Sequence, residues 1–447
     1  MLMDIPSLFR TAGTFERRLS PGAYLFHQGK KVESLFVVTA GEIQLVRHQT
    51  AGNALVLKTK KPCVKVGIAR RNSFVARGVP ALTAPPRPAA SSAVTMKCVA
   101  ALALLAASAH AASYSEELVE WALREHFSLF ESKFAKAYAT REERESRFVT
   151  FVENLEQVIS KNAALREAGA DEVHGVTQFS DWSKDEFAAR MLNPMIGQEK
   201  WPDMPVAVPK NITVPNSLDW RDSGAVTPVK NQQMCGSCWA HSAVESVESQ
   251  YAIRGGELTA LSVQQVVSCD ADNGDQGCEG GWYYTAWMDY MNKSGGVTTE
   301  AKYPYDSATA AGEATACDAN LAADVVPGTA PSAYSWATAQ CDSLFCNNQD
   351  EDMLKANLAS YGPISIACDA SEWSSYAGGV FTSASCKSSS LRLDHAIQLI
   401  GYNEDGDTPY WIVRNSWDTT WGEEGMIYLK MGENTCGVAD KAAMVTL

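Results

Sequence analysis

The amino-acid sequence predicts an α+β protein in which a polar helical segment precedes a cysteine-rich region of mixed helices and short strands. Residues 114–200 are polar and charged and repeat with the period of an α-helix. From residue 214 onward the chain is rich in Gly, Trp, Tyr and Cys, with apolar, strand-like runs at 393–400 and 410–417. At 447 residues the chain is long enough for two or three domains, each with its own core.

Composition and charge exclude several classes of protein. Apolar residues make up 46% of the chain, so wholesale disorder is excluded, and no apolar run reaches the roughly 18 residues of a membrane-spanning helix. The formal charge of −14 is unevenly spread, because residues 1–95 have a net charge of +10 and residues 214–447 a net charge of −19. The acidic region is a poor candidate for binding nucleic acid. Ten of the twelve cysteines lie between Cys235 and Cys436, as in secreted, disulfide-bonded domains.

Residues 96–111 have the pattern of a secretory signal peptide. They run from Met96 and a lysine through a short apolar stretch to the small residues Ala109 and Ala111. A buried helix is the alternative interpretation. Because a signal peptide normally opens a chain, we hypothesise that translation starts at Met96 and that residues 1–95 are an upstream fragment or a gene-model artefact.

The first 95 residues contain short apolar runs separated by glycines, followed by a Pro/Ala/Ser-rich linker from Pro80 to Ser92. Residues 19–58 weakly resemble the opening strands of a cyclic-nucleotide-binding β-roll. The resemblance ends before the phosphate-binding segment of that family, so no site residue transfers, and a cyclic-nucleotide sensor is a disfavoured alternative.

The clearest helix signal lies within the polar segment. Six residues recur there at steps of three and four, which keeps them on one face of a helix. The spacing by itself is compatible with an ordinary amphipathic helix. The six residues are Glu143, Arg147, Phe151, Asn154, Val158 and Asn162.

The chemistry of the chain centres on Cys235-Gly-Ser-Cys238. Gly236 and Ser237 are turn residues, and Trp239 to Tyr251 has a helical pattern, so Cys238 is expected at a helix N-terminus, where the macrodipole favours a thiolate. The two cysteines could form a redox-active Cys-x-x-Cys pair, or Cys238 could be an acyl-transfer nucleophile. Spacing alone leaves both possibilities open.

A cysteine nucleophile needs an imidazole and a group that orients it. Residues 214–447 contain two histidines, His241 and His395. His395 lies on the apolar run 393–400, and twenty residues later Asn415-Ser-Trp417 closes the second run. An asparagine carbonyl can accept the imidazole N–H, and a tryptophan can keep water away from that bond. This combination favours the nucleophile.

These three motifs together resemble the papain family of cysteine peptidases, most closely the cathepsin L-like members. The resemblance runs from about residue 120 to the C-terminus. The six-residue helix face resembles the long-helix signature of inhibitory propeptides, with Val158 where Ile is usual. Residues 175–181 resemble the second propeptide signature, with Thr177 where Asn is common. The resemblance implies a papain-like two-lobed fold, with a helical lobe from about residue 225 to 330 and a β-barrel-like lobe, preceded by a helical inhibitory propeptide.

The resemblance also implies the role of each catalytic residue. Cys238 would be the nucleophile, a thiolate paired with protonated His395, and His395 would donate a proton to the leaving amine. Asn415 would orient His395, and Trp417 would shield their contact. The side-chain amide of Gln232 and the backbone N–H of Cys238 would form the oxyanion hole.

The remaining cysteines fit the disulfide framework that the resemblance implies. A Cys235–Cys278 bridge would deprive Cys238 of a redox partner. The Cys-to-His spacing of 157 residues exceeds the usual range, and the excess is assigned to an insertion within residues 307–350, where we expect Cys341 to pair with Cys346. Cys368 is interpreted as a buried free thiol without function. The implied bridges are Cys235–Cys278, Cys269–Cys317 and Cys386–Cys436.

Substrate contacts are also implied by the resemblance. Gly280 and Gly281 match the strand that hydrogen-bonds the substrate backbone, where missing side chains permit close approach. Lys441 occupies the position of the pocket floor, which suggests tolerance of acidic or polar residues two positions before the scissile bond, unless Lys441 points to solvent. The main specificity pocket would be lined by Trp282, Tyr283 and Leu393.

His241 departs from the family pattern, which has an aromatic residue there. We interpret it as a packed core histidine rather than a second base, because it follows Cys238 on the same helix. No histidine lies between His241 and His395, so the histidine-bearing loop of exopeptidase relatives is missing and endopeptidase action is favoured.

The sequence therefore predicts a zymogen of a cysteine-type endopeptidase, activated by acid, in a lysosome, a vacuole or the extracellular space. Its parts are residues 1–95, a signal peptide at 96–111, a propeptide at 112–212 and a peptidase domain at 213–447. Polypeptide substrates and the propeptide are the expected partners of a monomer. No nucleic acid, membrane, metal or other cofactor is expected. A thiol–disulfide oxidoreductase and a catalytically dead binding relative are the alternatives.

Overall fold

The structure is a computed structural model that describes residues 36–38, 65–67, 116–197, 201–270, 274–341, 343, 345–346, 349–382, 386 and 389–447. It divides into two compact units, Met1–Leu129 and Phe130–Leu447. In the first unit β1 (Phe36–Val38) pairs antiparallel with β2 (Lys65–Gly67). The expected signal peptide, the Pro/Ala/Ser-rich linker and most of the β-roll resemblance lie outside the described residues.

The predicted propeptide helix is α3 (Arg141–Glu167), which follows α2 (Glu116–Lys133). The hydroxyl of Thr140 accepts a hydrogen bond from the Glu143 backbone N–H (3.0 Å), and the Glu143 carboxylate accepts one from the Ala139 N–H (2.8 Å). These bonds satisfy N–H groups that a helix start leaves without partners.

The predicted face of α3 contacts the segment that follows it in the chain. The side-chain amide of Asn154 donates to the carbonyl of Ser180 (3.0 Å), and that of Asn162 donates to the carbonyl of His174 (2.8 Å). Arg147 forms an ion pair with Glu186. The face therefore binds the loop of the second propeptide signature rather than forming a general amphipathic surface.

After this loop, α4 (Lys184–Met191) and the 3-10 turn η2 (Pro194–Gly197) lead toward the rest of the unit. The hydroxyl of Ser183 caps α4 by accepting from the Glu186 N–H (3.1 Å). Phe187 on α4 is buried edge-on against Trp417, with ring centroids 5.3 Å apart. The helix thus enters the hydrophobic core of the C-terminal region.

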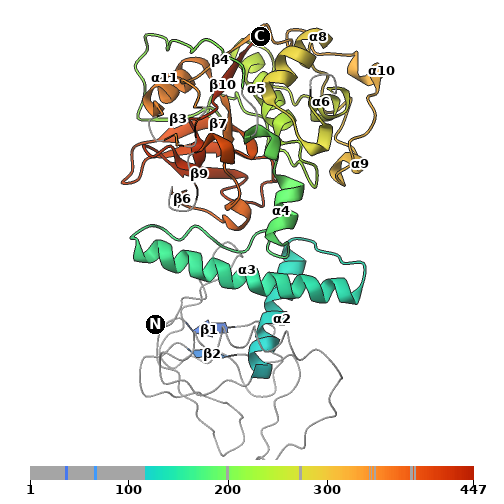
Figure 1. Cartoon of the computed structure of the whole chain (residues 1–447), viewed down its shortest axis with the longest axis vertical. Coiled ribbons are helices and arrows are strands. Elements are labelled where there is room, and N and C mark those ends of the chain that lie inside the picture. Colours follow the sequence, from blue (N-terminus) through green and yellow to red (C-terminus); the bar gives the residue numbers. More distant parts are fainter. Residues whose placement is uncertain are drawn as a thin grey trace, which may run out of the picture. The chain divides into compact units, whose positions relative to one another are not determined.

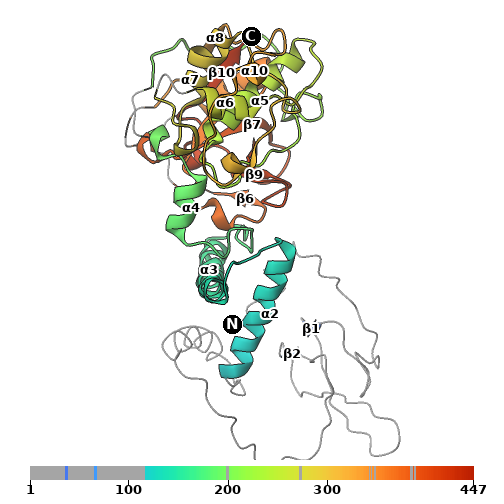
Figure 2. The same cartoon turned by 90° about the vertical axis from the view of Figure 1, so that its right-hand side faces the viewer.

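Residues 201–447 form a mixed sheet beside a group of helices (Figures 1 and 2). The sheet order is β4-β10-β5-β7-β8-β9-β6, with β3 also paired to β7. The β6–β9 pair is parallel, and the other pairs are antiparallel. The strands are β3 (Ser217–Asp219), β4 (Ala333–Trp336), β5 (Ile364–Cys368), β6 (Val380–Phe381), β7 (His395–Asn403), β8 (Tyr410–Arg414), β9 (Met426–Lys430) and β10 (Ala443–Thr446).

The helical elements begin with α5, which packs against β7. They are α5 (Cys238–Ile253), α6 (Val263–Cys269), η3 (Gly277–Glu279), α7 (Tyr283–Thr285), the π-helix η4 (Ala286–Met291), α8 (Asn292–Ser294), α9 (Ser307–Ala310), α10 (Ala319–Ala322), α11 (Glu351–Tyr361), η5 (Trp373–Ser375), η6 (Ser390–Arg392) and η7 (Thr435–Gly437).

Two hydrophobic cores underlie the two lobes. One surrounds α5 and contains Trp239 and Trp287; the other lies in the sheet and contains Trp411 and Trp421. Figure 1 shows α5, α6, α8 and α10 on one side and the strands on the other. The predicted α+β class is confirmed. Among the residues that the structure describes, no helix combines the length and apolar character needed to cross a bilayer.

Candidate active site

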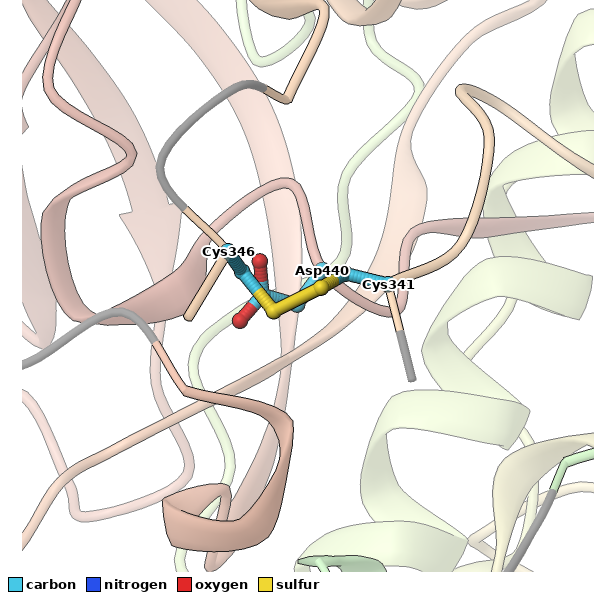
Figure 3. A group of neighbouring side chains, drawn as sticks. All are labelled: Cys341, Cys346 and Asp440. Carbon is cyan, nitrogen blue, oxygen red and sulfur yellow. A yellow bond between two sulfur atoms is a disulfide. The ribbon is translucent and has the colours of Figure 1, made fainter. Parts of the chain in front are cut away.

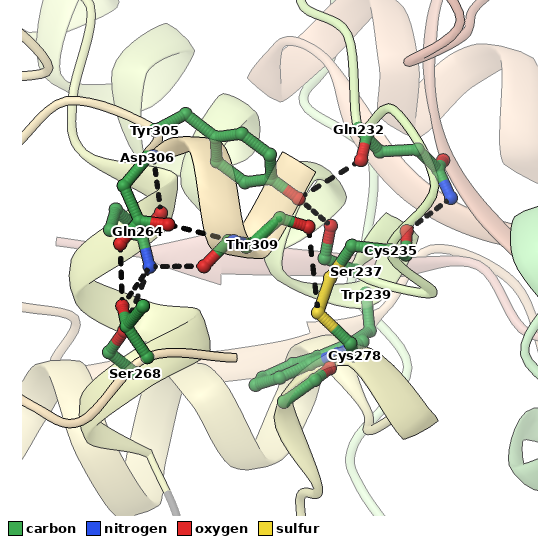
Figure 4. The surroundings of a disulfide bond; sticks show 12 residues. Gln232, Cys235, Ser237, Trp239, Gln264, Ser268, Cys278, Tyr305, Asp306 and Thr309 are labelled. Atoms are coloured by element: carbon green, nitrogen blue, oxygen red, sulfur yellow. Dashed lines mark hydrogen bonds between the residues drawn. A yellow bond between two sulfur atoms is a disulfide. The ribbon is translucent and has the colours of Figure 1, made fainter. Parts of the chain in front are cut away.

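Cys238 is the first residue of α5, as the sequence predicts, and its side chain is fully buried. Its sulfur accepts a hydrogen bond from the backbone N–H of Ala396 at 3.5 Å. Ala396 follows His395 on β7, so α5 and β7 bring the two predicted catalytic residues to the same place. Figure 4 shows the neighbouring turn, where the Cys235–Cys278 disulfide fixes the segment before the helix.

His395 opens β7, and its imidazole is held by residues that follow β8. Nε2 lies 2.8 Å from Oδ1 of Asn415, and the indole of Trp417 lies against the imidazole with ring centroids 4.7 Å apart. Nδ1 is buried and has no hydrogen-bond partner among the described residues. The second strand was predicted to reach residue 417 but ends at Arg414, because the chain leaves the regular ladder where Asn415 turns its side chain to His395.

Gln232 is buried between the two lobes of the site. Its Oε1 accepts hydrogen bonds from the hydroxyl of Ser416 (2.8 Å) and the indole N–H of Trp417 (3.1 Å). These two donors leave Nε2 to donate to the carbonyls of Cys235 (2.9 Å) and Met191 (3.1 Å). The amide expected in the oxyanion hole therefore already donates to the carbonyl oxygen of Met191, which lies within the expected propeptide.

Burial shifts the pKa values of both catalytic groups toward their neutral forms. Burial raises the pKa of Cys238 to about 12, although backbone hydrogen bonds, the first of them from Ala396, act in the opposite sense. Burial also lowers the pKa of His395 to about 4, although the hydrogen bond with Asn415 opposes this. Desolvation outweighs the helix macrodipole, so a neutral thiol and a neutral imidazole are favoured in this covered state.

A segment within the expected propeptide covers the site. We call residues 191–197 the cleft segment. The backbone N–H of Asn193 donates to the carbonyl of Asp394 (2.6 Å), and its side-chain amide donates to the carbonyl of Gly281 (2.7 Å). A Cβ atom on Gly280 would lie 2.3 Å from Oδ1 of Asn193. Gly280 thus permits a polypeptide to approach its backbone closely, whereas a Cβ atom on Gly281 would meet Asp275 and Trp239 of the protein's own core.

The residues expected around the specificity pocket are buried together with Trp201, which lies within the expected propeptide. Lys441 is only 1% exposed, so it does not point to solvent. Its ammonium lies 5.7 Å from the ring of Trp201 and 5.9 Å from that of Trp336. Trp201 also lies 4.9 Å from the ring of Tyr283. Trp282 and Leu393 are 3% and 1% exposed.

Four disulfides join cysteines within the part of the chain that the structure describes. They join Cys235 to Cys278, Cys269 to Cys317, Cys386 to Cys436, and Cys341 to Cys346. Cys238 and Cys368 are the free cysteines of the described part of the chain, and both are buried. Figure 3 shows Cys341 and Cys346 beside Asp440. Ligand atoms of the three lie within 4.8 Å of one another, but the sulfurs are bonded to each other, and the thiolate is the form of cysteine that binds a metal.

His241 lies in the core of the helical lobe. It is 2% exposed, its Nδ1 lies 3.0 Å from the carbonyl oxygen of Ser237, and its ring lies 5.6 Å from that of Tyr305. Burial lowers its pKa to about 3, so the ring is neutral. These contacts agree with a packed structural histidine.

Several site residues were not found from the sequence. Ser416 orients Gln232, and the hydroxyl of Tyr305 lies 2.8 Å from that of Ser237 and donates to the carbonyl of Gln232 (3.1 Å; Figure 4). Tyr305 follows α8 by more than ten residues and stands in no motif, so no local pattern could have indicated it. Ser416 lies within the recognised Asn415-Ser-Trp417 motif and could have been proposed from its position.

Comparisons with known protein families agree with this geometry. The papain family cysteine protease profile matches residues 214–446, and the cathepsin propeptide inhibitor domain (I29) matches residues 127–187. Among solved structures, digestive procathepsin L 3 of the Tenebrio molitor larval midgut is similar with a TM-score of 0.60 and 31% identity, covering 73% of this chain and 99% of that one. A recombinant stem bromelain precursor is similar with a TM-score of 0.59, 31% identity and the same two coverages.

Two curated cysteine proteinases are similar to this chain in sequence. A cysteine proteinase of Trypanosoma brucei brucei is 39% identical over 324 residues, which is 71% of this chain and 66% of that protein, just under two thirds of its length. Cysteine proteinase 1 of Dictyostelium discoideum is 38% identical over 333 residues, covering 70% of this chain and 90% of that protein.

Proposed function

The chain belongs to the papain family of cysteine proteases and carries a cathepsin-type inhibitory propeptide, and we propose that it is the zymogen of an endopeptidase using Cys238, His395 and Asn415. The family and the papain-like fold predicted from the sequence are thereby confirmed. The catalytic assignments, the mode of activation and the compartment are our proposals.

The proposed reaction is acyl transfer through a thioester. The Cys238 thiolate attacks the carbonyl carbon of the scissile bond, and the carbonyl electrons move onto its oxygen. As the C–N bond breaks, His395 gives its proton to the leaving amine. His395 then removes a proton from water, which displaces the Cys238 thiolate from the thioester and releases the acid. The Asn415 contact at Nε2 supports this role, because it leaves Nδ1 available for proton transfer.

Gln232 is proposed to stabilise the oxyanion together with the backbone N–H of Cys238. The support for this role is the contact with Met191, because an amide that donates to a propeptide carbonyl can donate to a substrate carbonyl at the same position. Ser416 and Trp417 hold the amide in advance, so it need not reorganise as charge develops. One such donor typically contributes roughly 3 to 4 kcal/mol to transition-state stabilisation.

Acid is proposed to release the propeptide through contacts outside the cleft. His174 is buried beside Ser375, with Nδ1 2.9 Å from the serine hydroxyl. Burial lowers its pKa to about 4, with Lys161 acting in the same sense and Glu372 in the opposite one. A released propeptide would take up a proton near the normal pKa of 6.5, which the bound form resists. Binding is therefore strongest above pH 6.5 and weakens as the pH falls toward 4.

The substrate is proposed to be a polypeptide lying along Gly280 and Gly281, with Trp282, Tyr283, Leu393 and Lys441 around its main side-chain pocket. Residues 112–212 would be removed and residues 213–447 would form the mature enzyme. The signal-peptide pattern at 96–111 and the four disulfides support a route through the secretory pathway to a lysosome, vacuole or the extracellular space.

The observation that carries the proposal is the convergence of Cys238, the His395–Asn415 pair and the propeptide-occupied Gln232 amide. It is tested by cleavage of fluorogenic peptides at mildly acidic pH with a thiol present, after processing of the chain. Cys238→Ala should be silent, whereas wild type and Cys368→Ser should be active, because Cys368, although it lies opposite His395 on β5, is a free cysteine of the described residues that the mechanism does not use. Silence of the processed wild type would contradict the proposal.

A thiol–disulfide oxidoreductase is the second candidate. It would need Cys235 free, but Cys235 is bonded to Cys278. Reduction of a disulfide substrate by the processed protein, together with no peptide cleavage, would favour it. A catalytically dead binding relative is a third candidate, disfavoured because every catalytic position carries the expected residue.

A further inference from the structure

The chain contains two sequons of the form Asn-X-Ser/Thr, which the proposed catalytic mechanism does not use. They are Asn211-Ile-Thr213 and Asn292-Lys-Ser294. This pattern is the acceptor for N-linked glycosylation in the secretory pathway, and the bulky, hydrophilic glycan has to lie on the protein surface. Asn211 and Asn292 are both exposed, so burial excludes neither position. Hydrogen bonding and position in the chain distinguish the two sequons.

Asn292 is already engaged in the fold of the helical lobe. It is the first residue of the short helix α8, and its side-chain amide donates a hydrogen bond to the carbonyl of Pro331 at 2.6 Å. The hydroxyl of Ser294 donates to the carbonyls of Met291 (3.2 Å) and Gly296 (2.9 Å). A sugar on the Asn292 amide nitrogen would crowd the contact with Pro331, so the fold disfavours a glycan at this position.

Asn211 lies in the segment that joins the expected propeptide to the expected peptidase domain. We call residues 205–216 the junction. The upstream part of the junction is fixed to α11, because the backbone N–H of Lys210 donates to the hydroxyl of Ser360 at 3.0 Å. The carbonyl of Val208 accepts a hydrogen bond from another side chain of the same helix. The chain is thus anchored up to the residue before the sequon.

The downstream part of the junction is fixed to the sheet. The carbonyl of Pro215 accepts a hydrogen bond from the hydroxyl of Tyr402 on β7 (2.8 Å), and Val214 packs against the core of the sheet. The three residues of the sequon stand between these two anchors, and all three are exposed, Ile212 to 44%. Exposed stretches of a loop are preferred sites of proteolytic cutting. We therefore expect a peptidase to reach the junction at the sequon itself.

We propose that Asn211 is an N-glycosylation site and that its glycan slows removal of the propeptide by shielding this stretch of the junction. The inference rests on the proposed function, which places the cut after residue 212, within the sequon. In the modification, the amide nitrogen of Asn211 bonds to the anomeric carbon of an oligosaccharide carried on a lipid diphosphate. The bond between that carbon and the diphosphate breaks, the lipid diphosphate leaves, and the amide gives up one proton.

A glycan on Asn211 obstructs cutting because a peptidase takes consecutive residues of an extended chain into its cleft. The cleft segment shows how closely a bound chain approaches, since a Cβ atom on Gly280 would lie 2.3 Å from Oδ1 of Asn193. A chain that carries an oligosaccharide one residue before Ile212 cannot make so close an approach. The glycan leaves with the propeptide, so the processed enzyme does not carry it at this position.

The test compares zymogens that differ only at the two sequons. Each carries Cys238→Ala, so that it cannot process itself, and each is produced in insect cells and purified from the medium. Peptide mapping by mass spectrometry should find the glycan on Asn211 of the parent zymogen. New N-termini between residues 210 and 215 should form on the order of tenfold faster in Asn211→Gln than in the parent, because cutting follows the accessibility of the cut site. Asn292→Gln is the matched control and should be cut at the parent's rate.

Two peptidases cut each zymogen, the processed wild-type enzyme and thermolysin, a metal-dependent peptidase. Removal of the glycan by a peptide-N-glycosidase should speed cutting of the parent to the rate of Asn211→Gln. An unmodified Asn211 in a zymogen that has formed its Cys235–Cys278 disulfide would overturn the proposal, as would equal cutting rates with and without the glycan. If thermolysin distinguishes the two forms but the processed wild type cuts neither, the proposed peptidase function fails while the shielding by the glycan stands.

Discussion

Two parts of the propeptide hold the enzyme by different physical means. The cleft segment, residues 191–197, binds through carbonyls, backbone N–H groups and the Asn193 side chain, none of which titrates near physiological pH. We call residues 173–178 the docking strand. It pairs with residues 374–377, with the Gly175 N–H donating to the carbonyl of Ser375 (2.7 Å), and it contains His174.

Charged contacts near the docking strand add to the difference in titratable groups between it and the cleft segment. Lys161 and Lys184 of the propeptide both pair with Glu372, at 2.7 and 2.6 Å. The groups by which the cleft segment itself binds do not titrate, whereas the part that anchors the propeptide outside the cleft contains titratable groups of its own. Acid can loosen the anchor by protonating groups that lie outside the cleft.

The largest expected effect comes from the cleft side. Gln232→Ala should lower kcat of the processed enzyme about 10²- to 10³-fold, because the oxyanion loses a preorganised donor. It should leave the pH dependence of propeptide release unchanged, since the amide does not titrate. Steady-state kinetics and release measured from pH 7 to pH 4 check both statements. A pH midpoint of propeptide release that differs between Gln232→Ala and wild type would contradict the distinction between the cleft segment and the docking strand.

The second effect comes from His174→Gln on the docking strand. In the wild type, the lowered pKa of about 4 against a normal 6.5 weakens binding by at most roughly 3 kcal/mol, a few hundredfold in affinity, as the pH falls through this range. Gln cannot take up the proton, so the variant should lose most of this weakening. The self-processing rates of wild type and His174→Gln at pH 7 and pH 4.5 measure this weakening of propeptide binding. An unchanged ratio of the two rates would contradict the role of His174.

The smallest effect is expected for Glu372→Gln. Although burial alone would raise it, hydrogen bonds and charges from Lys161 and Lys184 hold the pKa of Glu372 below its ordinary value. The stabilisation from this pair is therefore present above the ordinary pKa of 4.5 and lost at lower pH. Because Lys184 is largely exposed, loss of the ion pairs of Glu372 should cost about 0.5 to 1 kcal/mol of propeptide binding free energy. This corresponds to a few-fold lower propeptide affinity at pH 7. Competition binding at two salt concentrations would detect it.

The sequence predicted most of the fold and the core of the site, because these depend on contiguous motifs. The face of α3, the Cys238 helix and the His395 strand each carry their own periodic signal, and Asn415 is recognisable from its neighbours. Tyr305 and Trp201 could not be predicted, since each reaches the site through tertiary packing across long loops. The shift of the pKa values of Cys238 and His395 toward their neutral forms could not be predicted for a related reason, because the burial of these two residues is not visible in the motif around Cys238.

We expect the propeptide to cover Cys238 and to hold its thiol un-ionised until release. The most direct test is the rate of alkylation of Cys238 by iodoacetamide, followed by mass spectrometry of the intact chain between pH 5 and 9. The zymogen should react slowly throughout this range, in keeping with a pKa raised to about 12, and the processed enzyme should react rapidly already at pH 5. Equal rates for the two forms would contradict the claim.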